Sequence, residues 1–446
     1  MQITVVFGGP GTGKTSWLAN KYKELIKKYK LSEVVFISYT RKQVGNGQSK
    51  IKKLTNKKSK DIKSNFRTVH SLSKQSYGKD TDVLDYEICE KMSHFLDVDM
   101  TTVARGIDFM KNTLTANDAV GANRAGLDTA TFQKRKIFYD AVKEGYSKRG
   151  REMVDFADMI VNAVQSGYAS KAKAVLVDEC QDLSSLQWRA IYSVFSNVKE
   201  AYFAGDPNQA LYRFAGGASN YMLDMRCDNT VFLEQSKRCS QAVMDMASLI
   251  WKNMSKKVDI PRPANHQGFA VFYPEKNLQA TFIRPIIATL AKGKSILVLA
   301  NTYYQLTEME RLLLDGLNIP HNFIAGRRKD YCKGKDKVNL VFSTVHQAKG
   351  LEADYVIYDV SCGRSGEKSD YGTKAERYED YWRIVYTGIT RAREGIIACQ
   401  IAKPTADEPS CLETLYYSKF NFHNYKEWLG SCVTEKKKII VKRKGI

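Results

Sequence analysis

The amino-acid sequence predicts an α/β fold built from parallel sheets with helices on both faces. Short apolar runs alternate with segments of helical pattern, and the clearest runs lie at residues 3–7, 34–39, 174–178, 201–205, 295–300, 338–344 and 355–360. Uninterrupted apolar runs of this length are typical of parallel strands that are buried on both faces. At 446 residues the chain is also too long for one ordinary core, so two or three domains are expected.

The first apolar run leads into residues 8–15, which read GGPGTGKT and fit the G-x-x-x-x-G-K-[ST] pattern of a phosphate-binding P-loop. A helical segment, SWLANKYKELIKKY, follows directly. Glycines let backbone N–H groups turn toward phosphate, Lys14 can reach the β and γ oxygens, and the Thr15 hydroxyl is placed for Mg²⁺. A chance glycine-rich turn is the alternative, and the order of strand, loop and helix argues against it. The motif predicts a nucleoside triphosphate held by Gly8, Gly9, Pro10, Gly11, Thr12, Gly13, Lys14, Thr15 and Ser16.

Residues 84–151 carry no comparable apolar run and have a helical pattern of mixed charge, as in TFQKRKIFYDAVKEGYSKRG. We therefore expect a helical insertion in the first sheet domain. The expected layout is a first sheet domain at residues 1–84 and 153–233, the insertion at 85–152, and a second sheet domain with a basic tail at 234–446.

Two acidic residues stand at the end of the apolar run at 174–178, in VLVDECQD. A P-loop enzyme needs an Asp at such a strand end to hold the Mg²⁺ shell and a Glu to orient the attacking water. Asp178 and Glu179 fit these two roles, and an exposed acidic turn is the alternative. The position on a buried strand behind a P-loop favours the catalytic interpretation.

The next strand end leads into AYFAGDPNQALYRFAGG, residues 201–217. The Gln209 amide is suited to sensing a γ-phosphate. Tyr212 and Phe214 offer ring faces, with Arg213 between them, and rings beside a basic groove suit base stacking on a single strand. The alternative is that both rings belong to the core.

Three arginines lie after the first domain: Arg238 in LEQSKRCS, and Arg391 and Arg393 in VYTGITRARE. Arginine donors stabilise the charge that develops on a γ-phosphoryl group. Taken alone, each is equally compatible with a surface position.

The segment FSTVHQAKGLEADYVI, residues 342–357, is expected to form a strand, a polar loop and a second strand. Thr344, His346 and Lys349 are candidates for nucleic-acid phosphate, and Glu352 for a ribose hydroxyl. With no His or Cys nearby, a metal-ligand role for His346 is not expected.

Composition limits the class of protein. Lys and Arg number 69 against 48 Asp and Glu, and the resulting charge of +21 favours a polyanionic partner such as nucleic acid over a merely solvated basic surface. The charge is densest at residues 50–63 and in the tail at 436–444. Nine scattered cysteines without a C-x-x-C pair favour reduced thiols in a cytoplasmic compartment, prokaryotic or in a virus-infected host. No apolar stretch of 18 residues and no secretory leader is evident, so neither a membrane nor secretion is expected.

The motifs in order resemble the UvrD/Rep/PcrA family of superfamily 1A DNA helicases. The segments are GGPGTGKT, FISYTRKQ, TVHSLSK, VDFADMI, VDECQD, GDPNQALYRFAGG, LEQSKR, TVHQAKGLE and YTGITRARE, which span residues 8–394. DECQD, AKGLE and TRARE are the most specific of these segments.

The resemblance implies two RecA-like domains that hydrolyse ATP with Mg²⁺ and move 3′→5′ along single-stranded DNA. It implies metal ligation by Thr15 and Asp178, water activation by Glu179, γ-phosphate contacts from Gln209, Arg238 and Arg391, and ribose binding by Glu352. The implied DNA path comprises Tyr39, Thr40, His70, Tyr212, Phe214, Thr344 and His346. Single-stranded and tailed duplex DNA are the expected partners, and we expect a monomer that a protein partner can activate for unwinding.

Four departures from the family pattern carry further expectations. The stacking Tyr expected before Arg238 is Lys237, and the upstream Gln motif that reads adenine has no room before residue 8, so a relaxed nucleotide preference is expected. The Arg expected after the stacking aromatic is Ala215. The large subdomain 2B that precedes TVHQAKGLE in the family is expected to be absent, which predicts a minimal motor.

Three functional classes remain open from the sequence. The first is an ATP-dependent 3′→5′ DNA translocase or helicase. The second is an ATP-gated nucleic-acid-binding motor subunit of a replication, repair or nuclease complex, without unwinding of its own. The third is an RNA helicase, which the resemblance disfavours.

Overall fold

The computed structural model describes residues 1–55, 58–73, 81–84, 86–96, 99–147, 152–255, 257–273, 286, 289, 293–315, 319–326, 328–330, 338–362, 373–401, 412–415, 419–420 and 423–427. The basic tail at 436–444, most of the loop at 364–373 and part of the segment before TVHQAKGLE lie outside this set. The chain forms two compact units. Unit 1 takes in Met1–Gly8 and Gly13–Leu233, and unit 2 takes in Gly9–Thr12 and the described residues of Glu234–Ser365 and Lys374–Ile446.

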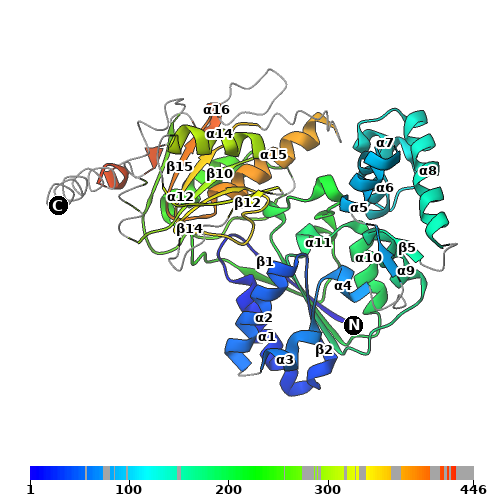
Figure 1. Cartoon of the computed structure of the whole chain (residues 1–446). Helices are drawn as coiled ribbons and strands as arrows, with labels where there is room; N and C mark the ends of the chain where they lie inside the picture. Colours follow the sequence, from blue (N-terminus) through cyan, green and yellow to red (C-terminus); the bar gives the residue numbers. More distant parts are fainter. Residues whose placement is uncertain are drawn as a thin grey trace, which may run out of the picture. The chain divides into compact units, whose positions relative to one another are not determined.

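Unit 1 is built on a six-stranded sheet in the order β3-β2-β6-β7-β1-β8, with every neighbouring pair parallel (Figure 1). Its strands are β1 (Gln2–Gly8), β2 (Val34–Ser38), β3 (Phe66–Arg67), β6 (Ala174–Asp178), β7 (Glu200–Gly205) and β8 (Asn229–Leu233). The register pairs Ser38 with Asp178 and Asp178 with Ala204, so these strands end side by side. Loops that leave their carboxyl ends therefore gather at one edge of the sheet.

Successive strand residues in unit 1 enter two different cores. Val5, Val35 and Val175 belong to one hydrophobic cluster. Their neighbours Val6, Phe36 and Leu176 belong to the other. Because side chains alternate across a strand, both faces of the sheet are buried, as the apolar runs predict. The covering helices are α1 (Lys14–Lys28), α2 (Arg41–Thr55), α3 (Ser59–Ile62), α4 (Val69–Ser73), α9 (Phe156–Gln165), α10 (Ser185–Val194) and α11 (Asn220–Leu223).

Four helices interrupt unit 1 between two short parallel strands, β4 (Thr81–Val83) and β5 (Glu152–Val154). They are α5 (Tyr86–Leu96), α6 (Met100–Asn112), α7 (Asp118–Ala125) and α8 (Thr129–Ser147), and they share a core that includes Val103, Ile107 and Phe132. This helical insertion is the one that the mixed-charge pattern predicts.

An ion cluster ties the insertion to α9. Lys111 Nζ lies 2.6 Å from Asp155 Oδ2 and 2.5 Å from Asp158 Oδ1. Lys143 pairs with the same two carboxylates, at 3.3 Å from Asp155. Asp155 also caps α9, where its side chain accepts a hydrogen bond from Asp158 N while Asp155 N donates to the Asp158 carboxylate. Burial alone would raise the pKa of Asp155, but Lys111 and Lys143 lower it to about 2.

Unit 2 carries an eight-stranded sheet in the order β12-β11-β13-β10-β14-β15-β9-β16. Its strands are β9 (Phe269–Tyr273), β10 (Ile296–Ala300), β11 (Asn322–Ala325), β12 (Arg328–Asp330), β13 (Leu340–Thr344), β14 (Ala353–Asp359), β15 (Ala392–Cys399) and β16 (Lys419–Phe420). Only the edge strands β12 and β16 run antiparallel to their neighbours. The helices of the unit are α12 (Gln241–Trp251), α14 (Tyr303–Leu314), α15 (Lys374–Ile389) and α16 (Leu412–Leu415).

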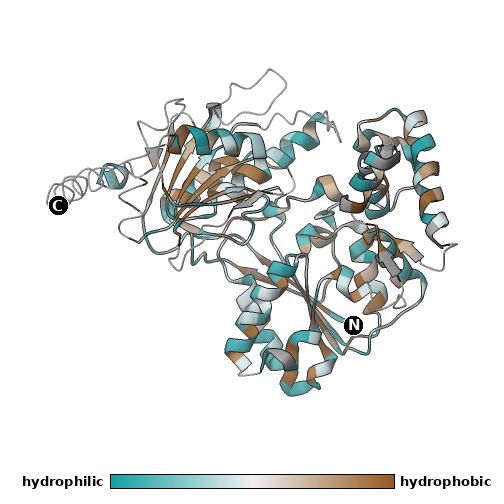
Figure 2. Ribbon diagram, in the orientation of Figure 1, coloured by the Kyte–Doolittle hydropathy of each residue, from teal (hydrophilic) through white to brown (hydrophobic). Residues whose placement is uncertain are grey.

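The fold class predicted from the sequence is confirmed: each unit has a mainly parallel sheet flanked by helices, and hydrophobic residues concentrate in the strands (Figure 2). The predicted runs did not include β8, β9 and β15, nor the short strands β3, β4, β5, β11, β12 and β16. β8 is largely exposed along its length, and in β15 polar Arg393 and Glu394 interrupt the apolar pattern. No helix within the described ranges is long and apolar enough to span a bilayer.

Candidate functional site

The P-loop turns from strand to helix at Gly13, which has a φ of 91° in the left-handed region. Glycine adopts this conformation without strain. Helix α1 begins at Lys14, so its first backbone N–H groups face the loop. Lys14 is 9% exposed, and its Nζ donates to the carbonyl of Gly8 at 2.7 Å. The loop therefore presents the lysine and a helix N-terminus at the carboxyl end of β1.

The Thr15 hydroxyl and the carboxylate of Asp178 are in direct contact. Thr15 Oγ1 donates to Asp178 Oδ2 at 2.7 Å, and Asp178 is 2% exposed at the end of β6. Burial and the neighbouring charge of Glu179 raise the pKa of Asp178 to about 6, although Thr15 and Lys14 oppose the increase. The P-loop and the strand-end acid, 163 residues apart in sequence, thus form one site.

Glu179 adopts an unusual backbone conformation, with φ 55° and ψ 40°. The left-handed region is uncommon for a residue with a Cβ, and such strain concentrates at functional sites. Gln181 Nε2 donates to Glu179 Oε2 at 2.6 Å and fixes the carboxylate. The strand-end turn and this hydrogen bond together set the position of the Glu179 carboxylate.

A buried amide links Glu179 to Gln209. While Gln181 Nε2 holds Glu179, its Oε1 accepts a hydrogen bond from Asp206 N at 3.0 Å. Gln209 Nε2 then donates to Asp206 Oδ2 at 2.8 Å, and Gln181, Asp206 and Gln209 are all at most 5% exposed. Sequence reasoning missed Gln181 and Asp206 as site residues. Their signal was present, since each lies within three residues of a predicted catalytic residue.

Three aromatic rings of unit 1 form a row beside this edge. The ring centroids of Tyr39 and Tyr212 are 4.7 Å apart, and those of Tyr212 and Phe214 are 6.0 Å apart. All three side chains are partly exposed, and Tyr39 also packs against a hydrophobic core of unit 1. Arg124 of α7 donates through Nε to the Phe214 carbonyl at 2.9 Å, and its guanidinium lies 5.9 Å from the ring centroid.

A cavity of about 750 Å³ lies between the sheet part of unit 1 and the helical insertion. Tyr39 and His70, two of the predicted nucleic-acid residues, line it. Burial lowers the pKa of His70 to about 4, so its imidazole is neutral at neutral pH. Burial also raises the pKa of Asp108, another lining residue, to about 6. Thr40, next to Tyr39, donates from its hydroxyl to Gln43 at 2.9 Å.

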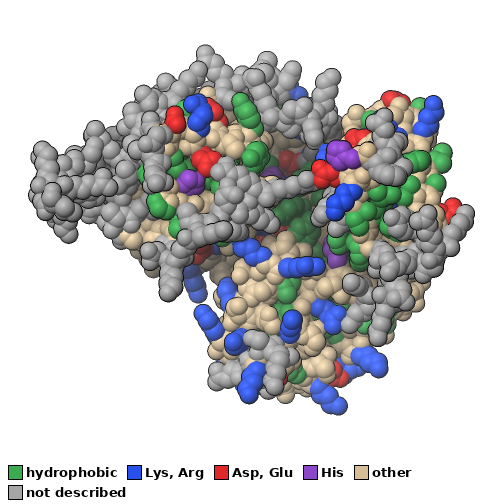
Figure 3. Space-filling model, in the orientation of Figure 1, with side chains coloured by type: hydrophobic (Ala, Val, Ile, Leu, Met, Phe, Trp, Pro, Cys, Tyr) green, Lys and Arg blue, Asp and Glu red, His purple; other side chains and the backbone are tan. Residues whose placement is uncertain are grey.

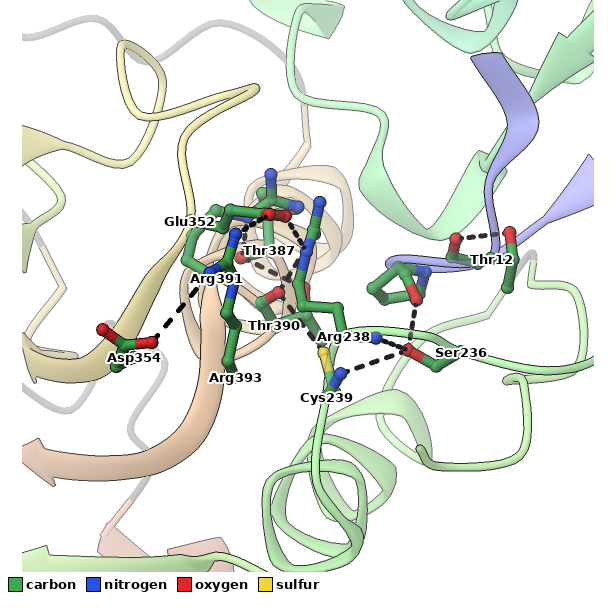
Figure 4. Close-up of polar contacts among 12 residues, drawn as sticks. Thr12, Ser236, Arg238, Cys239, Glu352, Asp354, Thr387, Thr390, Arg391 and Arg393 are labelled. Atoms are coloured by element: carbon green, nitrogen blue, oxygen red, sulfur yellow. Dashed lines mark hydrogen bonds and ion pairs between the residues drawn. The ribbon is translucent and has the colours of Figure 1, made fainter. Parts of the chain in front are cut away.

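In unit 2, Glu352 pairs with two arginines (Figure 4). Arg238 Nε lies 2.5 Å from Glu352 Oε2, and Arg393 Nη2 contacts Glu352 Oε1. Burial alone would raise the pKa of Glu352, but the two positive charges lower it overall. Arg391 is 3% exposed, and its Nε donates to the Thr387 carbonyl at 3.0 Å. Arg393, which sequence reasoning noted without a defined role, is therefore a direct partner of Glu352.

The other predicted residues of unit 2 follow β13. Thr344 is the last residue of that strand and is 8% exposed. His346 lies in the turn after it, which the bond from Ala348 N to the Thr344 carbonyl closes at 2.8 Å. A second cavity, of about 620 Å³, opens in unit 2 beside Arg238 and is lined in part by Lys237, His266 and Arg393.

Known proteins with similar sequences support one assignment. The family model of the UvrD/REP helicase N-terminal domain matches residues 1–229, and that of the UvrD-like helicase C-terminal domain matches residues 339–399. A probable DNA helicase II homolog of Mycoplasma genitalium is 25% identical over 284 residues, which are 56% of this chain and 40% of the relative. The ATP-dependent DNA helicase PcrA of Staphylococcus aureus is 25% identical over 367 residues, 73% of this chain and 49% of the relative.

The chain spans less than half the length of these two relatives. The N-terminal match alone nevertheless covers more than half of this chain and includes the P-loop, the strand-end acids and the aromatic row. The chain belongs to the UvrD/REP helicase family.

Proposed function

We propose that this protein is an ATP-dependent motor that moves 3′→5′ along single-stranded DNA and separates duplex strands. The observation that carries the proposal is the hydrogen bond between Thr15 and Asp178, beside a Glu179 that Gln181 holds in a left-handed turn. This arrangement has the parts that hydrolysis of a nucleoside triphosphate needs: a lysine for phosphate, oxygen ligands for a metal, and a carboxylate for water.

The residues present fit a Mg²⁺ ion. Thr15 Oγ1 and Asp178 Oδ2 are hard oxygen ligands already 2.7 Å apart, and burial of an acid beside Glu179 favours a cation there. Among the described residues no cluster of three or more His, Cys, Asp and Glu side chains forms a protein-only metal site. Mg²⁺ usually takes one or two protein ligands and completes its shell with water and phosphate. When bound, the ion would neutralise charge on the phosphate oxygens.

The chain's own groups would perform the remaining steps. Lys14 would exchange the Gly8 carbonyl for phosphate oxygens. Glu179 would accept a proton from the attacking water. Gln209 would contact the γ-phosphate, and its hydrogen bond to Asp206, which in turn is bonded to Gln181, would couple that contact to Glu179. Arg238 and Arg391 would donate to the transferred phosphoryl group, where arginine donors contribute about 10³- to 10⁵-fold in rate.

The aromatic row would carry the DNA. Stacking on aromatic rings contributes about 1–3 kcal/mol per base and does not depend on sequence. Tyr39, Tyr212 and Phe214 offer such a surface, and the Lys and Arg side chains spread over unit 1 supply charge for the phosphates (Figure 3). Thr344 and His346 are proposed to contact the strand from unit 2. Motion along a strand follows if ATP binding and release alter these contacts in turn.

We further propose a relaxed preference for the base of the nucleotide. The cavity beside Arg238 is lined in part by Lys237, at the position where the family resemblance implies a stacking tyrosine. A lysine has no flat face with which to select adenine. Turnover of GTP and CTP within about tenfold of ATP is expected, and a stronger preference for ATP would contradict this part of the proposal.

The deciding experiment is strand separation on duplexes with a 3′ or a 5′ tail, with ATP, GTP or no nucleotide. We expect separation only with nucleotide and only from the 3′ tail. Lys14→Ala should abolish turnover while single-strand binding persists, and Lys21→Ala, at a partly exposed lysine paired with Glu24 on the same helix, is the control. Separation from the 5′ tail would refute the polarity. DNA-stimulated hydrolysis without separation would instead indicate a motor subunit that needs a partner.

A further inference from the structure

The hydroxyl of Ser236 joins the P-loop to the turn that carries Arg238 (Figure 4). Ser236 Oγ donates to the Pro10 carbonyl at 2.8 Å and accepts hydrogen bonds from Arg238 N and Cys239 N, each at 3.2 Å. The residue is 1% exposed. A serine hydroxyl has one proton to donate and two lone pairs to accept with, and all three are engaged here.

The P-loop fits closely against the same turn. Lys237 N donates to the Gly11 carbonyl at 3.0 Å, which adds a second link between the segments. A Cβ on Gly11 would lie 2.4 Å from Arg238 Cβ and 2.9 Å from Ser236 Oγ, closer than real Cβ atoms approach. Only glycine therefore fits at this position, for reasons of space as well as its φ of 70°. Residues 9–12 and 236–239 thus form one packed element of unit 2.

The side chain of Arg238 is held separately from its backbone. Its Nε contacts Glu352 and its Nη1 donates to the Thr390 carbonyl at 3.3 Å. The backbone N–H, in contrast, donates to Ser236 Oγ. Glu352 therefore fixes the direction of the Arg238 guanidinium, and Ser236 fixes the position of the Arg238 backbone.

We propose that Ser236 is a positioning residue that sets Arg238 relative to the P-loop, so that phosphate binding at residues 9–12 is transmitted to this arginine. The inference rests on the proposed hydrolysis, in which Arg238 donates to the transferred phosphoryl group. Because its hydrogen-bonding capacity is filled and it is 1% exposed, Ser236 is assigned no direct contact with phosphate. Its loss should impair the chemical step more than nucleotide binding, since Lys14 and the helix N-terminus would still hold the phosphates.

The test compares Ser236→Thr with Ser236→Val, which have the same shape and differ only in the hydroxyl. We expect Ser236→Thr to retain near wild-type DNA-stimulated ATP turnover, and Ser236→Val to lose about 10- to 100-fold in kcat, with KM changed less than about threefold. Ser248→Ala removes another serine hydroxyl of unit 2 that donates to a backbone carbonyl, at 2.7 Å, and should leave kcat unchanged. Equal kcat for the Thr and Val variants would overturn the inference.

Amide hydrogen exchange on the full chain gives a second measure that does not need turnover. Ser236→Val should speed exchange both in residues 9–12 and in residues 236–239, whereas Ser236→Thr should not. Faster exchange in residues 236–239 alone would show that the hydroxyl does not couple the two segments and would overturn the inference. An inactive wild-type chain would refute the proposed hydrolysis, while the exchange result would still decide the coupling.

Discussion

Asp155→Asn tests how firmly the ion cluster of Lys111, Lys143, Asp155 and Asp158 holds the helical insertion. Asparagine caps a helix about as well as aspartate, so the change removes a charge and preserves the cap of α9. The two lysines are left with one carboxylate. Because the Asp155 side chain is only 10% exposed, solvent screens this loss weakly.

The lowered pKa of Asp155 gives the size of its contribution to the stability of the fold. A difference of one in pKa corresponds to about 1.4 kcal/mol, so lowering it from 3.8 to about 2 stabilises the fold by about 2 kcal/mol at neutral pH. Because the folded pKa lies below the unfolded value, this stabilisation is present above pH 3.8 and is lost as the pH falls toward 2. Asp155→Asn should remove it at pH 7.

Hydrogen–deuterium exchange read by mass spectrometry localises the effect. Amides of α6 and α9 should exchange about 30-fold faster at pH 7, the equivalent of about 2 kcal/mol in opening free energy. Asp118→Asn is the control, since its pair with Lys136 has side chains 23% and 32% exposed and is worth less than about 1 kcal/mol. If Asp155→Asn speeds exchange no more than Asp118→Asn, the cluster does not hold the insertion and the reasoning fails.

Three other predictions concern the same unit. Burial raises the pKa of Asp108 to about 6, so its charge destabilises the fold above that pH. Asp108→Asn should therefore raise Tm by a few degrees at pH 8, and by steadily less as the pH falls from 6 toward 4. An equal gain in Tm at all pH values would contradict burial of the charge as the cause. Single-strand affinity, read by fluorescence anisotropy, should fall by about 50-fold between 50 and 200 mM salt if four phosphates are contacted, and a flat profile would exclude phosphate contacts. Arg124→Gln should weaken single-strand affinity by about 5- to 10-fold, because it releases the Phe214 carbonyl, and should leave DNA-independent turnover unchanged. Lys134→Gln, at an exposed site on α8, is the control and should have no effect.

The local parts of the fold and of the site could be predicted from the sequence. The P-loop, the strand-end acids and the buried strands are each encoded within a dozen residues, so pattern and spacing suffice to find them. The hydrogen bond between Thr15 and Asp178 is consistent with topology, because β1 and β6 flank β7 in one parallel sheet and their carboxyl ends lie at the same edge.

The links between these parts could not be predicted. Ser236 contacts a carbonyl 226 positions away, and the LEQSKRCS segment gives no sign that its serine, as well as its arginine, matters. Gln181 lies inside a recognised motif, yet its role depends on which side of the strand end its amide faces. The conformation of Glu179 is likewise set by its surroundings, since nothing in a glutamate predicts a positive φ.

The division of the P-loop between the two units has a practical consequence for truncated proteins. Residues 9–12 pack with the segments around Ser236 and Pro261, although the strand before them and the helix after them belong to unit 1. A fragment that stops at Leu233 would carry the whole motif and its sheet, yet it would lack the side chains that shape the loop. A fragment can therefore contain the complete P-loop sequence and still fail to form the loop in its native shape. A fragment that failed to bind nucleotide would be no argument against the motif itself.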